Sequence, residues 1–265
     1  MPAAAAPLSF LRLALVLLLL LLWAACGASS NPEGQHQQQQ PAFSAPSSAG
    51  AAAAVPIKWS SAELGVSRLE SIDTELGKAF DAPITVGRKN ERGTCADCAS
   101  TRELLSKGYA AIYPRDIATL GVLTAKCLGL EALKSARQAR ASYMPAPPFN
   151  ASLIEILPAD LAPTITPAQQ QAVASASMAG QPLRKVEVTV AFEAARDEEI
   201  HIAGEGWQET LVLLGRADFD SDGLQDWLVR ADLAMERGTN RVSRLFLFTR
   251  DSSRVPLRTI RELKP

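Results

Sequence analysis

One short segment of the sequence gathers oxygen ligands in a spacing that suits a hard cation. Three alternate positions and one later position are aspartates: Asp218, Asp220, Asp222 and Asp226. On a tightly curved loop these carboxylates would point to one centre, Gly223 would permit the sharp turn, and the backbone carbonyl of Leu224 would add another oxygen. The pattern therefore predicts a calcium site, and its alternative is a solvated acidic turn.

This loop departs from the EF-hand, which needs a bidentate glutamate at its twelfth position, where the chain has Val229. Residues 215–229 instead resemble the calcium loop of FG-GAP and VCBS repeats, which lies between two strands of a propeller blade. The resemblance implies side-chain ligands at all four aspartates and a bracing role for the ion. It occurs once, and because a propeller needs several blades, no propeller is expected.

Three cysteines in the middle of the chain indicate a disulfide. Cys95 and Cys98 form a Cys-x-x-Cys pair, and Cys127 follows further along. In an oxidising compartment we expect Cys98 to bond to Cys127, because both should lie on helices that pack together, with Cys95 as the alternative partner. A redox pair of Cys95 and Cys98 is a second interpretation, but the βαβ unit and cis-proline of a thioredoxin are not found in the sequence.

The remaining candidate for chemistry is a single histidine. We expect His201 to be an ordinary strand side chain, although a pocket that gathered it with Glu193, Glu199 or Glu205 would favour an enzyme. The sequence contains no Gly-x-Ser-x-Gly elbow, His-Glu-x-x-His helix or phosphate-binding Gly-Lys-Thr. The sequence therefore predicts no catalytic residue.

An apolar segment predicts export. Residues 13–25 are apolar without interruption and lead into small residues, which is the order of a secretory signal peptide in residues 1–25. The residues Trp23-Ala24-Ala25-Cys26 resemble the lipobox of bacterial lipoproteins. The resemblance implies that Cys26 is acylated and, because no aspartate follows it, that the protein reaches the outer membrane. The alternatives are cleavage after Gly27 or Ala28, which gives a secreted or periplasmic protein, and an uncleaved anchor.

Composition limits the partners and marks a linker. The chain has 27 basic and 28 acidic side chains, so its formal charge of −1 offers no single-sign field that would attract nucleic acid or anionic lipid. Residues 26–56 are rich in Gln, Pro, Ser and Ala and contain too little apolar surface to fold. We expect them to link the membrane anchor to the folded part.

Apolar spacing and chain breakers predict the elements that position these residues. Helical spacing and caps predict helices at residues 62–79, 98–107, 116–142 and 166–178, the third with Arg137 and Arg140 near its end. Alternation and glycine turns predict strands at residues 84–86, 152–157, 185–192, 210–214, 226–231, 242–249 and 255–260, with a polar loop at 87–94. Short connections favour an antiparallel meander.

The elements together predict an α+β fold. A helical region at residues 57–144, pinned by the disulfide, precedes an α+β region at residues 145–265 that holds the small antiparallel meander and the calcium loop. The whole resembles bacterial envelope lipoproteins, which implies a non-catalytic module held to a membrane by its lipid and presenting a surface to an envelope partner. The alternative is an exported enzyme, either a thiol oxidoreductase using Cys95 and Cys98 or a hydrolase without a recognisable motif.

Overall fold

A six-stranded antiparallel meander forms the centre of the computed structural model, which describes residues 54–237 and 241–265. Its strands are β5 (Ala191–Arg196), β6 (Glu199–Gly204), β7 (Trp207–Ala217), β8 (Asp226–Met235), β9 (Arg241–Thr249) and β10 (Arg258–Leu263). Their order in the sheet is β10-β9-β8-β7-β6-β5, and the short β1 (Lys58–Trp59) pairs with the end of β7. Each long strand therefore lies beside its neighbour in sequence, as a meander requires.

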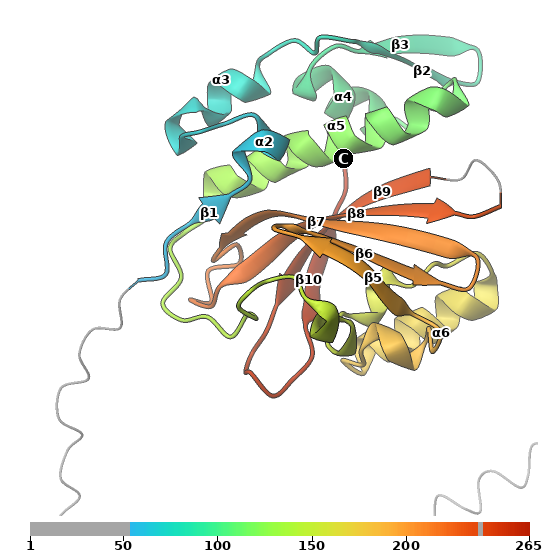
Figure 1. The fold of residues 1–265 in the computed structure, drawn as a ribbon. Helices are drawn as coiled ribbons and strands as arrows, with labels where there is room; N and C mark the ends of the chain where they lie inside the picture. Colours follow the sequence, from blue (N-terminus) through green and yellow to red (C-terminus); the bar gives the residue numbers. More distant parts are fainter. Residues whose placement is uncertain (1–53, 238–240) are drawn as a thin grey trace, which may run out of the picture. The chain divides into compact units, whose positions relative to one another are not determined.

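Both faces of the sheet are covered, and strands β7 and β8 lie in the middle (Figure 1). Helix α5 (Pro114–Ser135) packs on one face, against a core cluster that includes Leu130, Leu214 and Leu228. The other face carries Trp207, Trp227 and the side chains that pack on them. That second layer consists of the short helices η2 (Ala151–Glu155), η3 (Ala159–Leu161) and η4 (Leu183–Lys185) and helix α6 (Pro167–Met178). Strands β7 and β8 are covered on both faces, so both sets of alternating side chains are buried, and their sequences contain continuous apolar runs.

A smaller group of elements lies beyond α5 (Figure 1). A three-stranded sheet has the order β3-β2-β4. The elements in chain order are α2 (Ser61–Leu64), η1 (Leu69–Ser71), α3 (Ile72–Leu76), β2 (Ile84–Arg88), β3 (Glu91–Cys95), α4 (Cys98–Ser106) and β4 (Ala110–Ala111). The three-stranded sheet and α4 share a small apolar cluster with α5 that includes Ile84, Val86 and Leu120, whereas Leu64 of α2 and Ile72 of α3 join the core between α5 and the large sheet. The predicted α+β fold, with a helical region before a β meander, is confirmed.

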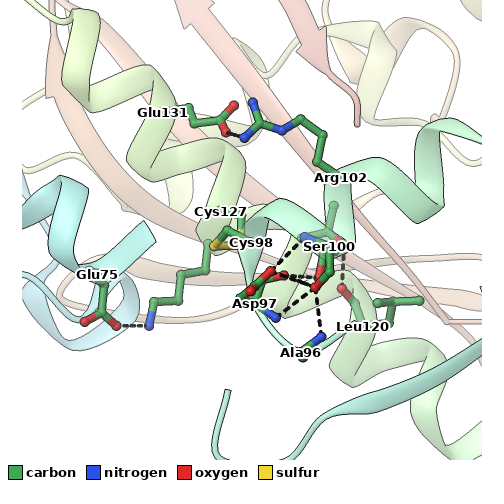
Figure 2. Close-up of a disulfide and its surroundings, with 12 residues drawn as sticks. Glu75, Ala96, Asp97, Cys98, Ser100, Arg102, Leu120, Cys127 and Glu131 are labelled. Carbon is green, nitrogen blue, oxygen red and sulfur yellow. Dashed lines mark hydrogen bonds and ion pairs between the residues drawn. A yellow bond between two sulfur atoms is a disulfide. The ribbon is translucent and has the colours of Figure 1, made fainter. Parts of the chain in front are cut away.

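The disulfide joins α4 to α5, as predicted. Cys98 is bonded to Cys127, with Cα atoms 5.4 Å apart, within the usual range for a disulfide. Figure 2 shows the bond at the first turn of α4, near the ion pair of Arg102 with Glu131 at 2.8 Å. Cys95, the alternative partner, is a buried free thiol at the end of β3. The helical region is thus pinned at one covalent point.

Local capping signals begin two of the helices. The Asp97 side chain accepts a hydrogen bond from the Ser100 amide at 2.7 Å and starts α4. Thr166 caps α6 in the same way, its hydroxyl accepting from the Gln169 amide, and Pro167 occupies the first turn. Each capping box satisfies amide groups that have no partner within the helix. The predictions of helices at 98–107 and 166–178 are therefore confirmed.

The predicted helix at residues 62–79 is wrong as a single element. Gly65 adopts φ 74°, a left-handed conformation that ends α2. A Cβ placed on Gly65 would lie 2.8 Å from a carboxylate oxygen of Glu75, so the glycine also allows the chain to pass close to α3. The apolar residues of this stretch are therefore divided among three short helices.

Three other local predictions are wrong. The predicted loop at residues 87–94 contains strand β3, which forms a hairpin with β2. The predicted strand at 152–157 is the 3-10 helix η2, capped by the Asn150 side chain, which accepts from the Ser152 amide at 2.9 Å. The alternating residues 185–192 form η4 and turns before β5, because the Glu187 amide donates to the Leu183 carbonyl. In these segments local hydrogen bonds outweigh the period of the apolar residues.

The third helix ends earlier than predicted. Helix α5 stops at Ser135, and Ala136 has an extended backbone with ψ 148°. Arg137 and Arg140 therefore lie on an extended segment that pairs with the aspartate loop, not on the predicted helix at 116–142. The pairing supplies backbone partners that a continued helix would have lacked at its end.

Some predictions fall on parts of the chain outside the described residues. These are the signal peptide at 1–25, the acylation of Cys26 and nearly all of the linker at 26–56. Among the residues that the structure describes, no helix combines the length and the apolar character needed to cross a membrane. The export of the protein remains a prediction from its sequence.

Removing the disulfide should weaken the helical region. The bond closes a segment with a sequence separation of 29, and the double variant Cys98→Ala with Cys127→Ala should lose about 2 to 4 kcal/mol of unfolding free energy. Urea unfolding followed by circular dichroism measures this loss. Wild-type protein treated with a reductant should match the double variant, and equal stability with and without the bond would contradict a structural role.

Glu209 should make stability depend on pH. Burial raises the pKa of this carboxyl to about 7, against the opposing effect of Arg244, which lies 3.2 Å away. Because the folded pKa exceeds the usual 4.5, the unfolded chain releases this proton first, and stability falls as pH rises from about 4.5 to about 7. Glu209→Gln should remove a fall of up to about 3 kcal/mol. Melting temperatures of both proteins across this range should diverge, and parallel curves would contradict the assignment.

Candidate metal centre

The predicted metal loop connects β7 to β8, the two central strands of the meander. Residues 218–225 form this connection, so the loop closes the hairpin that carries much of the core. Because the length and type of a turn fix the register of a hairpin, this loop sets the register between β7 and β8.

Backbone hydrogen bonds attach the loop to the extended segment that follows α5. Arg137 and Asp218 exchange two bonds, each 2.9 Å long from amide nitrogen to carbonyl oxygen. The Arg140 amide donates to the Gly223 carbonyl at 2.8 Å, and the Gln225 amide donates to the Ala141 carbonyl at 2.8 Å. These bonds satisfy backbone groups that a buried connection would otherwise leave unpaired. The loop is therefore held from outside the hairpin.

Side chains of the loop also shape its backbone. The two carboxylate oxygens of Asp218 accept from the amides of Ser221 at 2.6 Å and Gly223 at 3.0 Å. Asp220 accepts from the Asp222 amide at 3.1 Å, and Asp222 accepts from the Leu224 amide at 2.6 Å. Such turns curl the chain around its own aspartates.

Two loop residues have left-handed backbones. Ser221 has φ 70° and Gly223 has φ 89°. A Cβ on Gly223 would collide with the guanidinium of Arg140, whose Nη2 donates to the Asp222 carbonyl at 3.2 Å. The predicted need for glycine at this turn is thus explained both by its backbone angle and by this close approach.

Three of the four aspartates meet. One ligand oxygen from each of Asp218, Asp220 and Asp222 lies within 4.8 Å of the others. Asp218 is buried, whereas Asp220 and Asp222 are exposed. This group could hold a metal ion, because carboxylate oxygens this close can coordinate one hard cation.

Asp226 is the first residue of β8, directly after the loop. Its Oδ2 accepts from the Phe219 amide at 2.9 Å. Its side chain is fully buried, and its Oδ1 forms no hydrogen bond of good geometry among the described residues, although the buried Thr249 hydroxyl lies close enough to lower the pKa of this carboxyl. Burial, with the negative charges of Asp220 and Asp222, raises the pKa of Asp226 to about 7. Such an unpaired buried oxygen is costly, and a cation would remove part of that cost.

The loop holds uncompensated negative charge. Within residues 54–237 and 241–265, none of the four aspartates forms an ion pair with a lysine or arginine. Arg140 contacts a backbone carbonyl of the loop instead. Like charges held together repel, and a bound cation would relieve that repulsion. Asp226 and the Leu224 carbonyl as ligands remain predictions, since the observed group contains three carboxylates.

The other candidates for chemistry form different contacts. The Cys95 thiol is buried, and burial raises its pKa, which disfavours the reactive thiolate. The imidazole of His201 lies 2.6 Å from a carboxylate oxygen of Glu199 and 3.0 Å from the Thr210 hydroxyl. The His201 and Glu199 side chains are 34% and 39% exposed, so this is a partly solvated contact on strands β6 and β7. Sequence reasoning had not paired His201 with Thr210, because strand β6 was not predicted.

Substitution of Asp218 should lower the unfolding free energy more than substitution of Asp220. In a chelator, Asp218→Ala removes two charge-assisted hydrogen bonds and should cost about 2 to 4 kcal/mol of unfolding free energy. Asp220→Ala removes one exposed bond and some repulsion, so its cost should stay below about 1 kcal/mol. Denaturant unfolding measures both losses, and equal losses would show that Asp218 does not organise the loop.

Comparisons with family models, curated proteins and solved structures find no significant match to this chain. The likeness of residues 215–229 to FG-GAP and VCBS loops therefore rests on the residues of the loop alone.

Proposed function

We propose that this chain is an exported, non-catalytic envelope protein whose aspartate loop binds calcium. One observation carries the metal proposal: one carboxylate oxygen from each of Asp218, Asp220 and Asp222 lies within 4.8 Å of the others, and none of these carboxylates forms an ion pair with a lysine or arginine among the described residues. The next carboxylate, Asp226, is fully buried and has one oxygen without a well-formed hydrogen bond. Proteins rarely retain such a group unless an ion, a water or a function accounts for it. A cation held by the loop accounts for all four carboxylates together.

The donor set favours calcium among the common metals. Its side-chain donors are carboxylate oxygens, whereas zinc prefers histidine and cysteine ligands. Magnesium demands a near-ideal octahedron and usually keeps several waters, but calcium accepts irregular cages of six to eight oxygens. A loop with carboxylates at alternate positions fits the more permissive ion.

The proposed role of the ion is to brace the central hairpin. The loop fixes the ends of β7 and β8 and is bonded to the segment after α5. An ion that binds only the folded loop would stabilise the fold by mass action. Both the hairpin and the contact with residues 137–141 would then depend on calcium.

The proposed location is the outer membrane of the cell envelope, which the protein would reach through an acylated Cys26; both proposals come from the sequence. The disulfide between Cys98 and Cys127 is consistent with an oxidising compartment. Extracellular modules bind calcium with dissociation constants of about 0.1 to 1 mM. The proposal also includes attachment to the membrane through the lipid and, separately, binding to another protein of the envelope.

Calcium should raise the melting temperature of the wild-type protein. At a calcium concentration about 100 times the dissociation constant, the expected gain is about 2.7 kcal/mol. Asp220→Ala should abolish this gain, because it removes an exposed ligand without removing the hydrogen bonds of Asp218. Differential scanning calorimetry in calcium and in chelator measures the effect.

A matched control is Asp81→Ala, which removes an exposed carboxylate between α3 and β2, in the smaller group of elements and away from the β7–β8 turn. This variant should keep the full response to calcium. If wild-type protein melts at one temperature in calcium and in chelator, the loop is an acidic turn.

The lipid anchor is tested separately. Intact-mass analysis of the exported protein should find a mature chain that begins at Cys26 and carries acyl groups, and Cys26→Ser should release the protein from membranes. A mature chain without lipid that begins at Ala28 or later would rule out the anchor and leave the calcium proposal intact.

A further inference from the structure

Exposed apolar side chains gather where α5 begins. Four large apolar residues there are more than a third exposed: Ile112, Tyr113, Ile117 and Val242. They come from the connection between β4 and α5, from the first turns of α5 and from the start of β9. We call these four side chains, with Ala110 and Ala111 of β4, the α5 entry patch. Ile117 and Val242 line one hollow and Ile112 lines the next, and exposed apolar surface of this kind commonly marks an interaction site.

Two hollows adjoin the entry patch and share Ala110 and Ala111 in their linings. The first has a volume of about 410 Å³ and a mainly apolar lining that includes Leu105, Ile117 and Val242. The second has about the same volume, 410 Å³, and a polar lining that includes Lys89 and Arg92 of the β2–β3 hairpin. An apolar hollow therefore lies beside a cationic one.

Cations surround the apolar side chains. Arg115 lies over the Tyr113 ring at 5.2 Å, and Arg88 lies over the Tyr109 ring at 5.4 Å. Lys89, Arg92 and Arg241 are also exposed around the two hollows. The carboxylates among them are already engaged: Glu91 with Arg88 and Tyr109, and Asp116 with Arg115. Although the formal charge of the whole chain is −1, the side chains around the α5 entry patch carry an excess of positive charge.

We propose that the α5 entry patch docks on a membrane surface that contains anionic phospholipid. The apolar hollow and the exposed side chains would enter the acyl boundary, and the arginine and lysine side chains would contact lipid phosphates. Tyrosines beside cations suit this interface, because their rings are apolar and their hydroxyls remain hydrated. The choice of an anionic partner follows from the charge of the rim, to which each basic side chain near a surface adds attraction.

The proposed docking depends on one part of the proposed function, which is that the protein reaches a membrane. It does not depend on the aspartate loop or on calcium binding. Val55, the first residue paired in the fold, lies beside Ala139 beyond the other end of α5. The 22 residues of α5, at about 1.5 Å per residue, separate the two ends by about 33 Å. Docking would therefore fix the orientation of the folded part at a point remote from its N-terminal attachment.

Amide hydrogen exchange on the full chain in vesicles tests the proposal. Sedimentation gives the fraction of protein bound to each kind of vesicle, so that the exchange pattern can be referred to bound protein. Vesicles of phosphatidylcholine are compared with vesicles that contain phosphatidylglycerol, in calcium and in chelator. The amides at the start of α5 are informative because the first turn of a helix leaves its N–H groups without helical partners. We expect exchange at residues 110–117 and 241–243 to slow at least about tenfold on the anionic vesicles alone.

Charge reversal provides the matched variants. Lys89→Glu with Arg115→Glu should remove the protection, because both side chains are exposed and neither supports the core. Arg196→Glu with Arg254→Glu changes the net charge equally at exposed sites outside the patch and should keep it. Sodium chloride at about 0.5 M should also remove the protection by screening.

Three outcomes would overturn the proposal. The first is unchanged exchange at the patch on anionic vesicles, and the second is equal protection on both kinds of vesicle. The third is protection that depends on protein concentration instead of lipid, which would identify the patch as a contact with a second copy. A melting temperature that is insensitive to calcium would defeat the calcium proposal but would leave the docking result unchanged.

Discussion

The pairing of β7 with β8 is the interaction on which the rest of the structure depends. Both strands are covered on both faces, by α5 on one side and by the short helices and α6 on the other. Their connection must therefore turn sharply within a crowded structure and satisfy its own backbone groups. It does so with aspartates that accept from loop amides and with a backbone pairing to residues 137–141. The same aspartates that accept these hydrogen bonds place negative charges close together without an ion pair among the described residues. The proposed metal ion would neutralise those charges.

Polar groups buried in the sheet follow a related logic. Arg244 donates to the carbonyls of Asp160 and Leu161 at 3.0 Å each and lies 3.2 Å from Glu209. One guanidinium thus ties η3 to the sheet while it offsets a buried carboxyl. On the opposite face, Arg230 joins Glu63 of α2 to Asp232 of its own strand, at 2.5 and 2.9 Å. Arg244 thus joins the sheet to η3 on one face, and Arg230 joins it to α2 on the other. These buried ion pairs and hydrogen bonds restrict how the helices can pack on the sheet.

Features set by neighbouring residues could be predicted from the sequence, whereas features set by distant contacts could not. The helices that begin near Cys98 and Thr166 and the antiparallel meander follow from local spacing, and the preference for Cys98 over Cys95 as the partner of Cys127 follows from its place on a helix. Residues 185–192 alternate like a strand, yet Val188 is 81% exposed and the segment turns instead. For the site, the spacing predicts four converging aspartates, of which Asp218, Asp220 and Asp222 meet, and it does not predict the segment that supports the loop. The pairing of the loop with residues 137–141 depends on the early end of α5, which no local signal fixed.

The central claim is that one calcium ion binds the turn between β7 and β8 and stabilises that pair. A calcium titration followed by two-dimensional amide NMR tests it most directly, because each residue reports for itself. The account predicts one saturable set of shifts at residues 218–226 and 137–141, and no comparable change at α6. Absence of shifts at millimolar calcium, or small shifts spread over exposed carboxylates throughout the surface, would contradict it.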